Sequence, residues 1–360
     1  MTKTTFHICV LPGDGIGVDV IDATLPLLAR LEHDAPFAFQ FATHPAGAQH
    51  YKATGDALPD ATLAAARGAD AILFGAMGWP EIRYPDGTEI APQLDLRVIL
   101  ELYAGVRPAR AIPGIPLPLA DPRARDIDLV VVRESTEGLF ASRGKGVVEN
   151  DREARDTMVI TRAGSERVHD FAFRLAQRRK RRGRPGRVTC VDKANVFVSM
   201  AFFRRIFDER SRAFPEVEAR HNYIDATALD LIRKPWEFDV LVTENMFGDI
   251  LSDQTAALVG GMGMAPSADI GDRHALFQPC HGSAPDIAGQ GKANPAATIL
   301  SAAMMLDWLG ETHGNDALAK AGERLERAVD GVFASGLIKT YEFGGRDGTR
   351  AIADAVASNL

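Results

Sequence analysis

Short apolar runs bounded by turn-forming residues recur along the chain and predict buried β-strands. They are too short for typical helices and rich in β-branched residues, a pattern typical of strands that are covered on both faces. The predicted strands are residues 6–11, 71–75, 129–133, 157–161, 188–191 and 238–243.

Between these runs, apolar residues repeat every three to four positions, which predicts amphipathic helices. The clearest stripes are Val20, Ile21, Thr24, Leu27, Leu28 and Leu31 in one helix, and Val168, Phe171, Ala172, Leu175 and Ala176 in another. Helices are also predicted at residues 94–103, from residue 248 onward and at 294–309, and two amphipathic helices end the chain. Because strands and helices alternate, the predicted fold class is α/β.

Composition narrows the function classes. The chain has 360 residues, of which 46% are hydrophobic and 25% are charged, so it can form a large core and its length favours two domains. The net charge of −7 argues against nucleic acid as the main partner. One basic run, residues 178–187, follows a helical stripe and is interpreted as a solvated helix end that leads into a turn.

Targeting signals and cysteine spacing bear on localisation. The N-terminus has no apolar segment and no cleavage signature, and no apolar run approaches membrane-spanning length. Cys9, Cys190 and Cys280 lie far apart without metal-ligand spacing, which indicates buried thiols in a reducing compartment. We therefore expect a cytoplasmic protein without a membrane partner.

A pair of acidic residues follows the run at 238–243. Asp249 and Asp253 are four positions apart, so a helix presents both carboxylates on one face. A hard divalent cation would relieve their repulsion and takes oxygen ligands. Acidic pairs at this spacing are also common on solvated helix surfaces, so the spacing alone supports both interpretations equally.

The segment at 223–253, which contains this pair, resembles the metal-binding segment of the β-decarboxylating dehydrogenases, the family of isopropylmalate and isocitrate dehydrogenases. The resemblance extends from the motif at 11–17 to the last turn, and isopropylmalate dehydrogenase-like proteins are most similar in pattern. It implies a cofactor domain of residues 1–102 and 260–360, and a central domain of residues 103–259 that binds substrate and metal and forms a dimer. It does not imply a Rossmann fold, because the spacing of Gly13, Gly15 and Gly17 is not G-x-G-x-x-G.

The resemblance also implies the metal site and the catalytic base. Asp249 and Asp253 would hold Mg²⁺ or Mn²⁺ together with Asp225 of the partner subunit, so a homodimer would share its active sites. Lys193 directly follows a predicted strand and matches the family lysine that takes the proton of the C2 hydroxyl as general base. Asn195 would assist in positioning the substrate.

Three arginines at predicted strand or helix ends match family positions that bind a malate core. Arg97, Arg107 and Arg133 carry guanidinium groups that suit bidentate carboxylate recognition, although a single arginine is usually solvated or in an ordinary salt bridge. Together they imply a small dicarboxylate or tricarboxylate 2-hydroxy acid as the substrate.

A loop near the C-terminal third resembles the adenosine-binding loop of the family. Its matching residues are His281, Gly282, Ser283, Ala284 and Asp286, followed by Asn294. A carboxylate at Asp286 accepts hydrogen bonds from the ribose hydroxyls and repels a 2′-phosphate, so NAD is the expected cofactor.

The sequence departs from the family pattern at several positions. Phe140 replaces the usual tyrosine, which is thought to protonate the enol after decarboxylation, and phenylalanine has no proton to give. Gln278 replaces a usual glutamate. Gln93 and Ile90 occupy the positions of an apolar leucine and a glutamate in isopropylmalate enzymes. A polar Gln93 suits a smaller or polar C3 substituent, unless it points to solvent.

These departures leave several functions open. The leading hypothesis is NAD- and metal-dependent oxidation, with decarboxylation, of a 3-substituted D-malate-type acid. The alternatives are a tartrate or D-malate dehydrogenase, an isocitrate or homoisocitrate dehydrogenase, and a dehydrogenase that does not decarboxylate because of Phe140. A non-catalytic regulatory subunit is a different class, but such subunits tend to lose the lysine or the aspartates that are present here. Metal binding through histidines, as in related pyridoxine-pathway enzymes, is disfavoured by the all-aspartate set.

Overall fold

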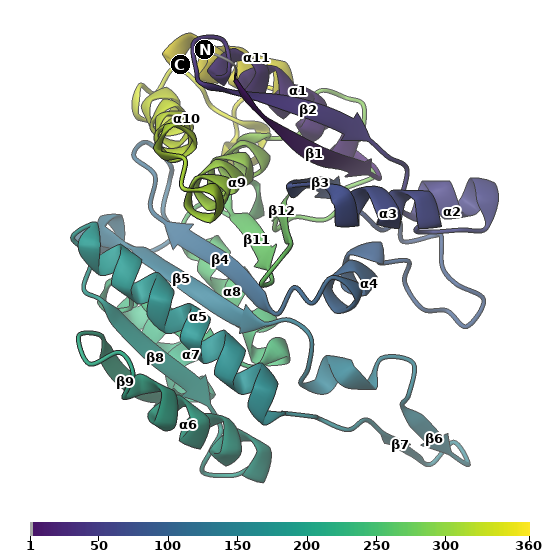
Figure 1. Cartoon of the computed structure of the whole chain (residues 1–360), viewed down its shortest axis with the longest axis vertical. Coiled ribbons are helices and arrows are strands. Elements are labelled where there is room, and N and C mark those ends of the chain that lie inside the picture. Colours follow the sequence, from purple (N-terminus) through teal and green to yellow (C-terminus); the bar gives the residue numbers. More distant parts are fainter. Residues whose placement is uncertain (1–2) are drawn as a thin grey trace. The chain divides into compact units, whose positions relative to one another are not determined.

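The computed structural model describes residues 3–360, which form two compact units (Figure 1). The first unit comprises Met1–Leu100, Ile112–Pro116 and Val259–Leu360, and the second comprises Glu101–Ala111 and Leu117–Leu258. The chain thus leaves and re-enters the first unit. The assignment of a cofactor role to one unit and a substrate role to the other stays a prediction.

The first unit contains five strands and seven α-helices within the described residues. In chain order they are β1 (Thr4–Gly13), α1 (Ile16–Leu31), β2 (Phe37–Thr43), α2 (Ala48–Thr54), α3 (Asp60–Gly68), β3 (Ala71–Ala76), α4 (Pro92–Ile99), β11 (Pro266–Ile270), β12 (Ala275–Pro279), α9 (Ala296–His313), α10 (Asp316–Ala334) and α11 (Thr349–Asn359).

The strands of the first unit lie in the order β2-β1-β3-β12-β11. All neighbours are parallel except β11 and β12, which are antiparallel. The strands β1 and β3 are largely apolar and buried, and α9 packs on β12, β11 and β3. Helix α9 is buried along most of its length, because α10 covers the side of it that faces away from the sheet.

The second unit contains a five-stranded arrangement, a separate hairpin and four α-helices within the described residues. In chain order they are β4 (Ala104–Arg110), β5 (Asp128–Glu134), β6 (Val147–Glu149), β7 (Glu153–Arg155), α5 (Arg162–Arg181), β8 (Arg187–Asp192), α6 (Val198–Ser211), β9 (Glu218–Tyr223), α7 (Ile224–Arg233), β10 (Val240–Thr243) and α8 (Asn245–Leu258).

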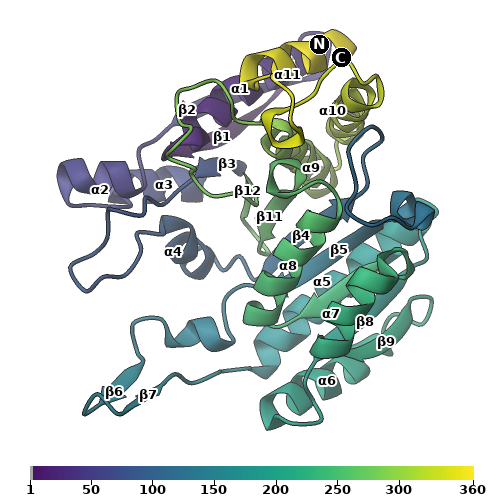
Figure 2. The same cartoon turned by 180° about the vertical axis from the view of Figure 1, so that it is seen from behind.

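The main strands of the second unit lie in the order β4-β5-β10-β8-β9. Only β4 is antiparallel to its neighbour β5, and the other pairs are parallel. Helices α5 and α6 lie on one face, and α7 and α8 lie on the other, as Figures 1 and 2 show from opposite sides. The hairpin β6–β7 projects from the rest of this unit in both views and is exposed throughout.

The predicted α/β class is confirmed, but several predicted elements differ from the observed ones. Residues 157–161 are not a strand, because they form a single bridge at Val159 and then end in Thr161, whose side chain caps α5. The helix predicted at 94–103 ends at Ile99, because Glu101 adopts a left-handed φ of 53° and strand β4 begins at Ala104. The predicted strands did not include β4, because its arginines and proline interrupt the apolar pattern that indicates a strand.

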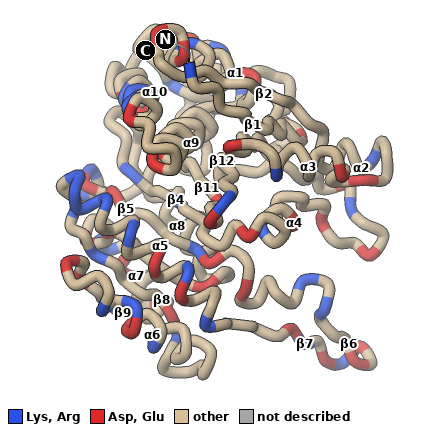
Figure 3. The backbone as a smooth tube through the Cα atoms, in the orientation of Figure 1, with Lys and Arg blue, Asp and Glu red and all other residues tan. Residues whose placement is uncertain are grey.

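The basic run at 178–187 is not simply solvated. Figure 3 shows its positive charges gathered where α5 ends. Arg179 is largely buried and bonds Asp239 at 2.6 Å and Asp128 at 3.0 Å. Part of the run therefore forms ion pairs that hold the end of α5 against the starts of β5 and β10. Within residues 3–360, no helix is long and apolar enough to cross a membrane.

Candidate active site

The parallel strands of the second unit bring three predicted site residues to one edge of the sheet. Thr243 of β10 pairs with Arg133 of β5 on one side and with Val191 of β8 on the other. Asp192 in turn pairs with Tyr223 of β9. Because the carboxyl ends of parallel strands meet at the same edge, Lys193 and Asp225 emerge along the edge that holds Arg133.

Helix α8 starts at this edge because Glu244 caps it. The Glu244 carboxylate accepts hydrogen bonds from the backbone N–H groups of Met246 at 3.0 Å and Phe247 at 2.6 Å. The helix therefore starts at Asn245, three residues before the predicted start at Gly248. Asp249 and Asp253 follow within its first turns and share one face, as their spacing predicted.

Gly248 lets Arg133 pass beneath this helix. A Cβ atom at Gly248 would lie 2.6 Å from both Cβ and Cγ of Arg133, which is closer than real Cβ contacts allow. The side chain of Arg133 is 4% exposed, and it donates to Asn245 Oδ1 at 2.8 Å through Nε and to Asp249 through Nη1. Its carbon Cζ also lies 5.0 Å from the centroid of the Phe140 ring, in a cation–π contact.

Arg107 joins this group from the neighbouring strand. In the antiparallel register Gly105 pairs with Arg133, so Arg107, two residues further along β4, lies on the same face of the sheet as Arg133. Arg107 is buried. Burial raises the pKa of the Asp253 carboxyl above its usual value, the charge of Asp249 adds to this effect, and Arg107 and Arg133 oppose it. Two acids and two guanidinium groups therefore interact electrostatically in this unit.

Lys193 and Asp225 form a second polar group at the same sheet edge. The Lys193 Nζ lies 2.6 Å from Asp225 Oδ1, and this hydrogen bond is the main cause that lowers the pKa of Asp225. Asp225 is exposed, and Asn195 is exposed two residues beyond Lys193. Within residues 3–360, no three His, Cys, Asp or Glu side chains come together as a metal site. The structure thus brings Asp249 and Asp253 together but not Asp225 with them in one chain.

Arg97 belongs to the first unit and lies on α4. It is buried, and its Nε donates to Asp269 Oδ2 at 3.0 Å. Gln93 lies one helical turn earlier. Its Oε1 is buried and has no hydrogen-bond partner within residues 3–360, so this oxygen does not point to solvent. Ile90, just before this helix, is fully buried against a small apolar cluster.

The turn at residues 13–17 packs against the predicted cofactor loop at residues 281–286. Gly15 has a φ of 55°, and a Cβ atom there would lie 2.0 Å from the carbonyl oxygen of Ser283. That carbonyl accepts a hydrogen bond from the backbone N–H of Ile16 at 2.8 Å, and Asp19 Oδ2 accepts one from Gly289 at 2.8 Å. The glycines therefore permit close contact between two backbone segments of the first unit.

The residues of this loop differ in burial and in whether their polar atoms already have a hydrogen-bond partner. His281 Nδ1 lies 2.9 Å from the carbonyl oxygen of Gly282, while its buried Nε2 has no partner within residues 3–360. Burial lowers the pKa of His281, which favours the neutral ring. Asp286 is exposed, and Ser283 and Ala284 are at least partly buried.

Asn294 forms hydrogen bonds that stabilise the fold of the first unit. Its Oδ1 accepts from the backbone N–H of Ala296 at 3.0 Å, at the start of α9, and its Nδ2 donates to Glu342 at 2.7 Å. Burial raises the pKa of Glu342 above its usual value. A structural role at the start of α9 thus accounts for the hydrogen bonds of Asn294 in this chain.

Two residues that support the arginines were not predicted. Asn245 receives Arg133, and its Nδ2 donates to the carbonyl oxygen of Glu137 at 3.0 Å. Asp269 receives Arg97 and is fully buried. A single acid inside the apolar run of β11 is the signal that could have revealed Asp269, because a buried charge needs a partner.

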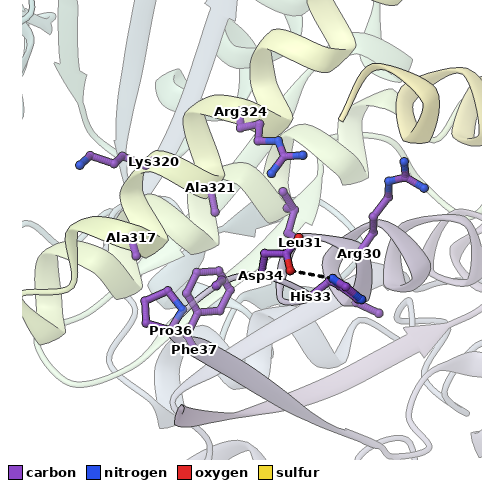
Figure 4. A pocket seen from close by; sticks show the side chains of 12 residues that line it. Arg30, Leu31, His33, Asp34, Pro36, Phe37, Ala317, Lys320, Ala321 and Arg324 are labelled. Atoms are coloured by element: carbon purple, nitrogen blue, oxygen red, sulfur yellow. Dashed lines mark hydrogen bonds and ion pairs between the residues drawn. The ribbon is translucent and has the colours of Figure 1, made fainter. Parts of the chain in front are cut away.

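Two pockets of the first unit lie away from these residues. One, with a volume of about 540 Å³, is lined by residues from the end of α1, the start of β2 and α10, among them His33 and Lys320 (Figure 4). Another, of about 820 Å³, includes Asp19 and Gly291. None of the predicted site residues lines either pocket.

Comparisons with known proteins give one consistent family. The family model described as isocitrate/isopropylmalate dehydrogenase matches residues 7–356. A protein of Methanocaldococcus jannaschii named 3-isopropylmalate/3-methylmalate dehydrogenase is 44% identical, with 98% of each chain covered. A homoisocitrate dehydrogenase of the same organism is 43% identical over 87% of this chain and 88% of that protein.

Solved structures agree with this result. The isocitrate dehydrogenase of Methylococcus capsulatus is 37% identical and superposes with a TM-score of 0.86, covering 98% of this chain and 99% of that chain. The predicted fold of this type, which is not a Rossmann fold, is therefore confirmed.

Proposed function

The chain belongs to the isocitrate/isopropylmalate dehydrogenase family and is a decarboxylating dehydrogenase, and we propose that it oxidises a 3-substituted D-malate-type acid with NAD and Mg²⁺ or Mn²⁺. The observation that carries this proposal is the cluster of Arg107, Arg133, Asp249 and Asp253 in the second unit. Such a cluster suits an anion and a divalent cation together, because its guanidinium groups bind carboxylates and its carboxylates bind hard cations.

The donor set of α8 fits a hard divalent metal. Asp249 and Asp253 offer oxygen ligands on one helical face, and the raised pKa of Asp253 reflects a charge that a cation would stabilise. Asp249 already holds one cation, the guanidinium of Arg133. We propose that Asp225 of the partner subunit completes the metal site, since the two acids of one chain leave it short of ligands.

The chain's own groups supply binding and proton transfer. Arg107 and Arg133, buried and next to Asp249 and Asp253, bind the carboxylates of the acid. Lys193 takes the proton of the C2 hydroxyl, for which its nitrogen must leave Asp225 at 2.6 Å. When bound, the metal would supply Lewis-acid polarisation at the C2 oxygen, and NAD would supply the hydride acceptor.

The loop at 281–286 fits a dinucleotide. His281 offers a buried, neutral ring whose Nε2 can accept a hydrogen bond from a ligand. A Cβ atom at Gly282, Gly289 or Gly291 would meet nothing within 4 Å, so open space lies beside the loop backbone. The exposed carboxylate of Asp286 suits ribose hydroxyls and disfavours a 2′-phosphate, which supports NAD over NADP.

Exposed apolar residues support a homodimer formed by the second unit. Asp225, Leu229 and Ile232 are spaced to share one face of α7, where Leu229 is 55% and Ile232 is 50% exposed. Val198, shortly after Lys193, is 88% exposed. Because apolar surface of this kind is usually covered by a partner, the same segments that carry Lys193 and Asp225 would reach into the partner subunit's site.

Gln93 supports a small or polar substituent at C3. Its buried, unpaired Oε1 would be left without a hydrogen bond beside an isopropyl group, which costs free energy. A hydroxyl substituent, or a water beside a small substituent, can donate a hydrogen bond to it. The proposed substrates are therefore D-malate and its hydroxylated derivatives ahead of 3-isopropylmalate.

A substrate panel tests this proposal. D-malate, tartrate, isocitrate, homoisocitrate and 3-isopropylmalate are each incubated with NAD or NADP and Mn²⁺, and reduced cofactor is followed by absorbance. We expect NAD to exceed NADP at least about tenfold in kcat/KM, since one unfavourable charge contact is worth ~1.4 kcal/mol or more. We also expect activity to disappear with a chelator and with Asp249→Asn.

The outcomes separate the parts of the proposal. Full activity of Asp249→Asn in the presence of a chelator would contradict the metal site. Equal efficiency with NAD and NADP would show that Asp286 does not face the ribose. A clear preference for 3-isopropylmalate would contradict the role given to Gln93.

A further inference from the structure

Three buried polar side chains of the first unit meet at one carboxylate oxygen. Asp269 Oδ2 accepts a hydrogen bond from Arg97 Nε at 3.0 Å and another from Gln278 Nε2 at 2.8 Å. Asp269 is 0% exposed, Arg97 is 6% exposed and Gln278 is 7% exposed. A buried ionic group of this kind costs free energy unless its charges are matched, so this arrangement needs a reason.

The strand register explains how Asp269 and Gln278 meet. Strands β11 and β12 are antiparallel, and Ser267 pairs with Gln278. Asp269 lies two residues from Ser267 and therefore on the same face, diagonal to Gln278 and within reach of its amide. Arg97 reaches the same oxygen from the last turn of α4.

The contact leaves the far end of the Arg97 guanidinium unused. Within residues 3–360, Arg97 makes no other hydrogen bond, so its two Nη groups can bind a ligand carboxylate. Fixing Nε against a buried acid holds the plane of the guanidinium in place. A guanidinium held in this way binds a carboxylate with less loss of conformational entropy.

Gln278 is neutral, which suits its position beside the carboxylate of Asp269. As a neutral amide it donates to Asp269 and adds no second negative charge beside the first. A glutamate there would place two carboxylates at hydrogen-bond distance, and two such groups cannot both ionise. A neutral amide at 278 therefore keeps a second negative charge away from the Asp269 carboxylate.

We propose that Asp269 is a positioning residue that holds Arg97 for a substrate carboxylate, and that Gln278 is its matched neutral partner. This inference rests on the proposed function, because it takes Arg97 as a substrate-binding residue. It also accounts for Gln278, whose departure from the usual glutamate is matched by the acid at 269.

A reciprocal exchange of the two residues tests the proposal. The variants are Asp269→Asn, Gln278→Glu and the double variant that carries both changes. D-malate and 3-isopropylmalate are the probes, and each variant is measured by steady-state kinetics with NAD and Mn²⁺ and by binding calorimetry. Thermal unfolding is recorded for every protein.

We expect Asp269→Asn to raise KM for the acid at least about tenfold, because Arg97 loses the contact that orients it. The values of kcat and of KM for NAD should change little. Gln278→Glu should add a further ionisation to the pH profile of kcat/KM, since its two carboxylates must share a proton. The double variant again has one carboxylate and one amide, and should return KM to within about threefold of the parent.

Two results would contradict the roles proposed for Asp269 and Gln278. If Asp269→Asn lowers the melting temperature but leaves KM and calorimetric affinity for the acid unchanged, Asp269 is only structural and the proposal fails. If the double variant is no better than the worse single variant, the two residues are not matched. Should Asp269→Asn fail to fold, Gln278→Glu and the double variant still decide between these outcomes.

A matched control and a separate readout complete the design. Asp239→Asn removes another fully buried carboxylate, which pairs with Arg179 in the second unit, and should reduce stability without raising KM. A parent that binds D-malate but does not reduce NAD would contradict the proposed function. The calorimetric comparison of Asp269→Asn with the parent would still decide the role of Asp269.

Discussion

Single residues govern how Arg133 is presented. Its guanidinium is held by Asn245, by Asp249 and by the ring of Phe140, and it reaches Asp249 because Gly248 has no side chain. Each neighbour limits a different movement of the guanidinium. Substitutions at these neighbours should therefore change substrate binding more than stability.

Gly248→Ala should separate these two effects. The added Cβ would meet Arg133 at 2.6 Å and displace it, so we expect KM for the acid to rise about tenfold or more while KM for NAD is unchanged. Alanine favours helix by about 1 kcal/mol over glycine, which offsets part of any loss of stability. Gly68→Ala is the control, because a Cβ at this helical glycine meets nothing within 4 Å. An unchanged KM in Gly248→Ala would contradict the steric argument.

Phe140→Tyr should restore a proton donor without removing the ring that contacts Arg133. If enol protonation limits turnover, we expect single-turnover formation of the decarboxylated ketone to accelerate by the order of a hundredfold, a typical value for general acid catalysis. NAD affinity should not change. Phe140→Leu lacks both ring and hydroxyl and is the control. If CO₂ release already keeps pace with reduced-cofactor formation in the parent, another group supplies the proton.

At the scale of elements, α5 and α6 enclose a neutral histidine. His169 is fully buried between Phe203 and Phe207, at ring-centroid distances of 4.3 and 5.3 Å, and its Nε2 lies 3.2 Å from the carbonyl oxygen of Phe203. Burial lowers the pKa of His169 from 6.5 to about 3. This helix pair therefore excludes the protonated form of the ring.

Acid should weaken the fold through His169. Between pH 6.5 and about 3 the unfolded chain binds a proton that the folded chain does not. The free energy of unfolding therefore falls as pH drops below 6.5, by about 1.4 kcal/mol per pH unit from this group. His169→Gln keeps a donor for the Phe203 carbonyl but cannot titrate, so its slope in urea unfolding from pH 7.5 to 5 should be shallower. The same change at the exposed His33 is the control, and equal slopes for His169→Gln and the parent would contradict the argument.

Prediction from the sequence succeeded where the apolar pattern was uninterrupted. Strands β3, β5 and β10 are nearly pure apolar runs, and each was predicted within about two residues of its observed ends. Strand β4 was missed because Arg107 and Pro108 interrupt its pattern. The start of α8 was misplaced because its cap is a glutamate, which is not among the preferred capping residues.

The candidate site was predictable in its residues more than in its contacts. The spacing of Asp249 and Asp253 gave their shared face directly. The contact between Lys193 and Asp225 spans 32 positions and depends on the register of β8 with β9, which no local pattern encodes. The acid inside β11 could have indicated a buried charge at Asp269, but not its partner Arg97, which is 172 positions away.

For the whole molecule, the main consequence concerns the oligomer. The described residues contain one acidic pair on α8 and a separate contact between Lys193 and Asp225, without a complete three-residue metal site. Apolar side chains beside both groups are exposed, including Phe197 at 53% and Ile250 at 59%. A symmetric dimer would cover these side chains and combine the two groups from different subunits.

Subunit mixing tests this arrangement. Lys193→Ala and Asp249→Ala should each abolish activity as homodimers. After the two are mixed and allowed to exchange, half of the dimers are mixed, and each mixed dimer has one site with both substitutions and one site with neither. We therefore expect recovery of about one quarter of the parent activity. Lys193→Ala mixed with Asp225→Ala is the control, because both changes affect the same contribution to a site and no intact site can form. If the first mixture stays inactive although mass spectrometry detects the mixed dimer, each chain builds its site alone and the shared-site proposal is wrong.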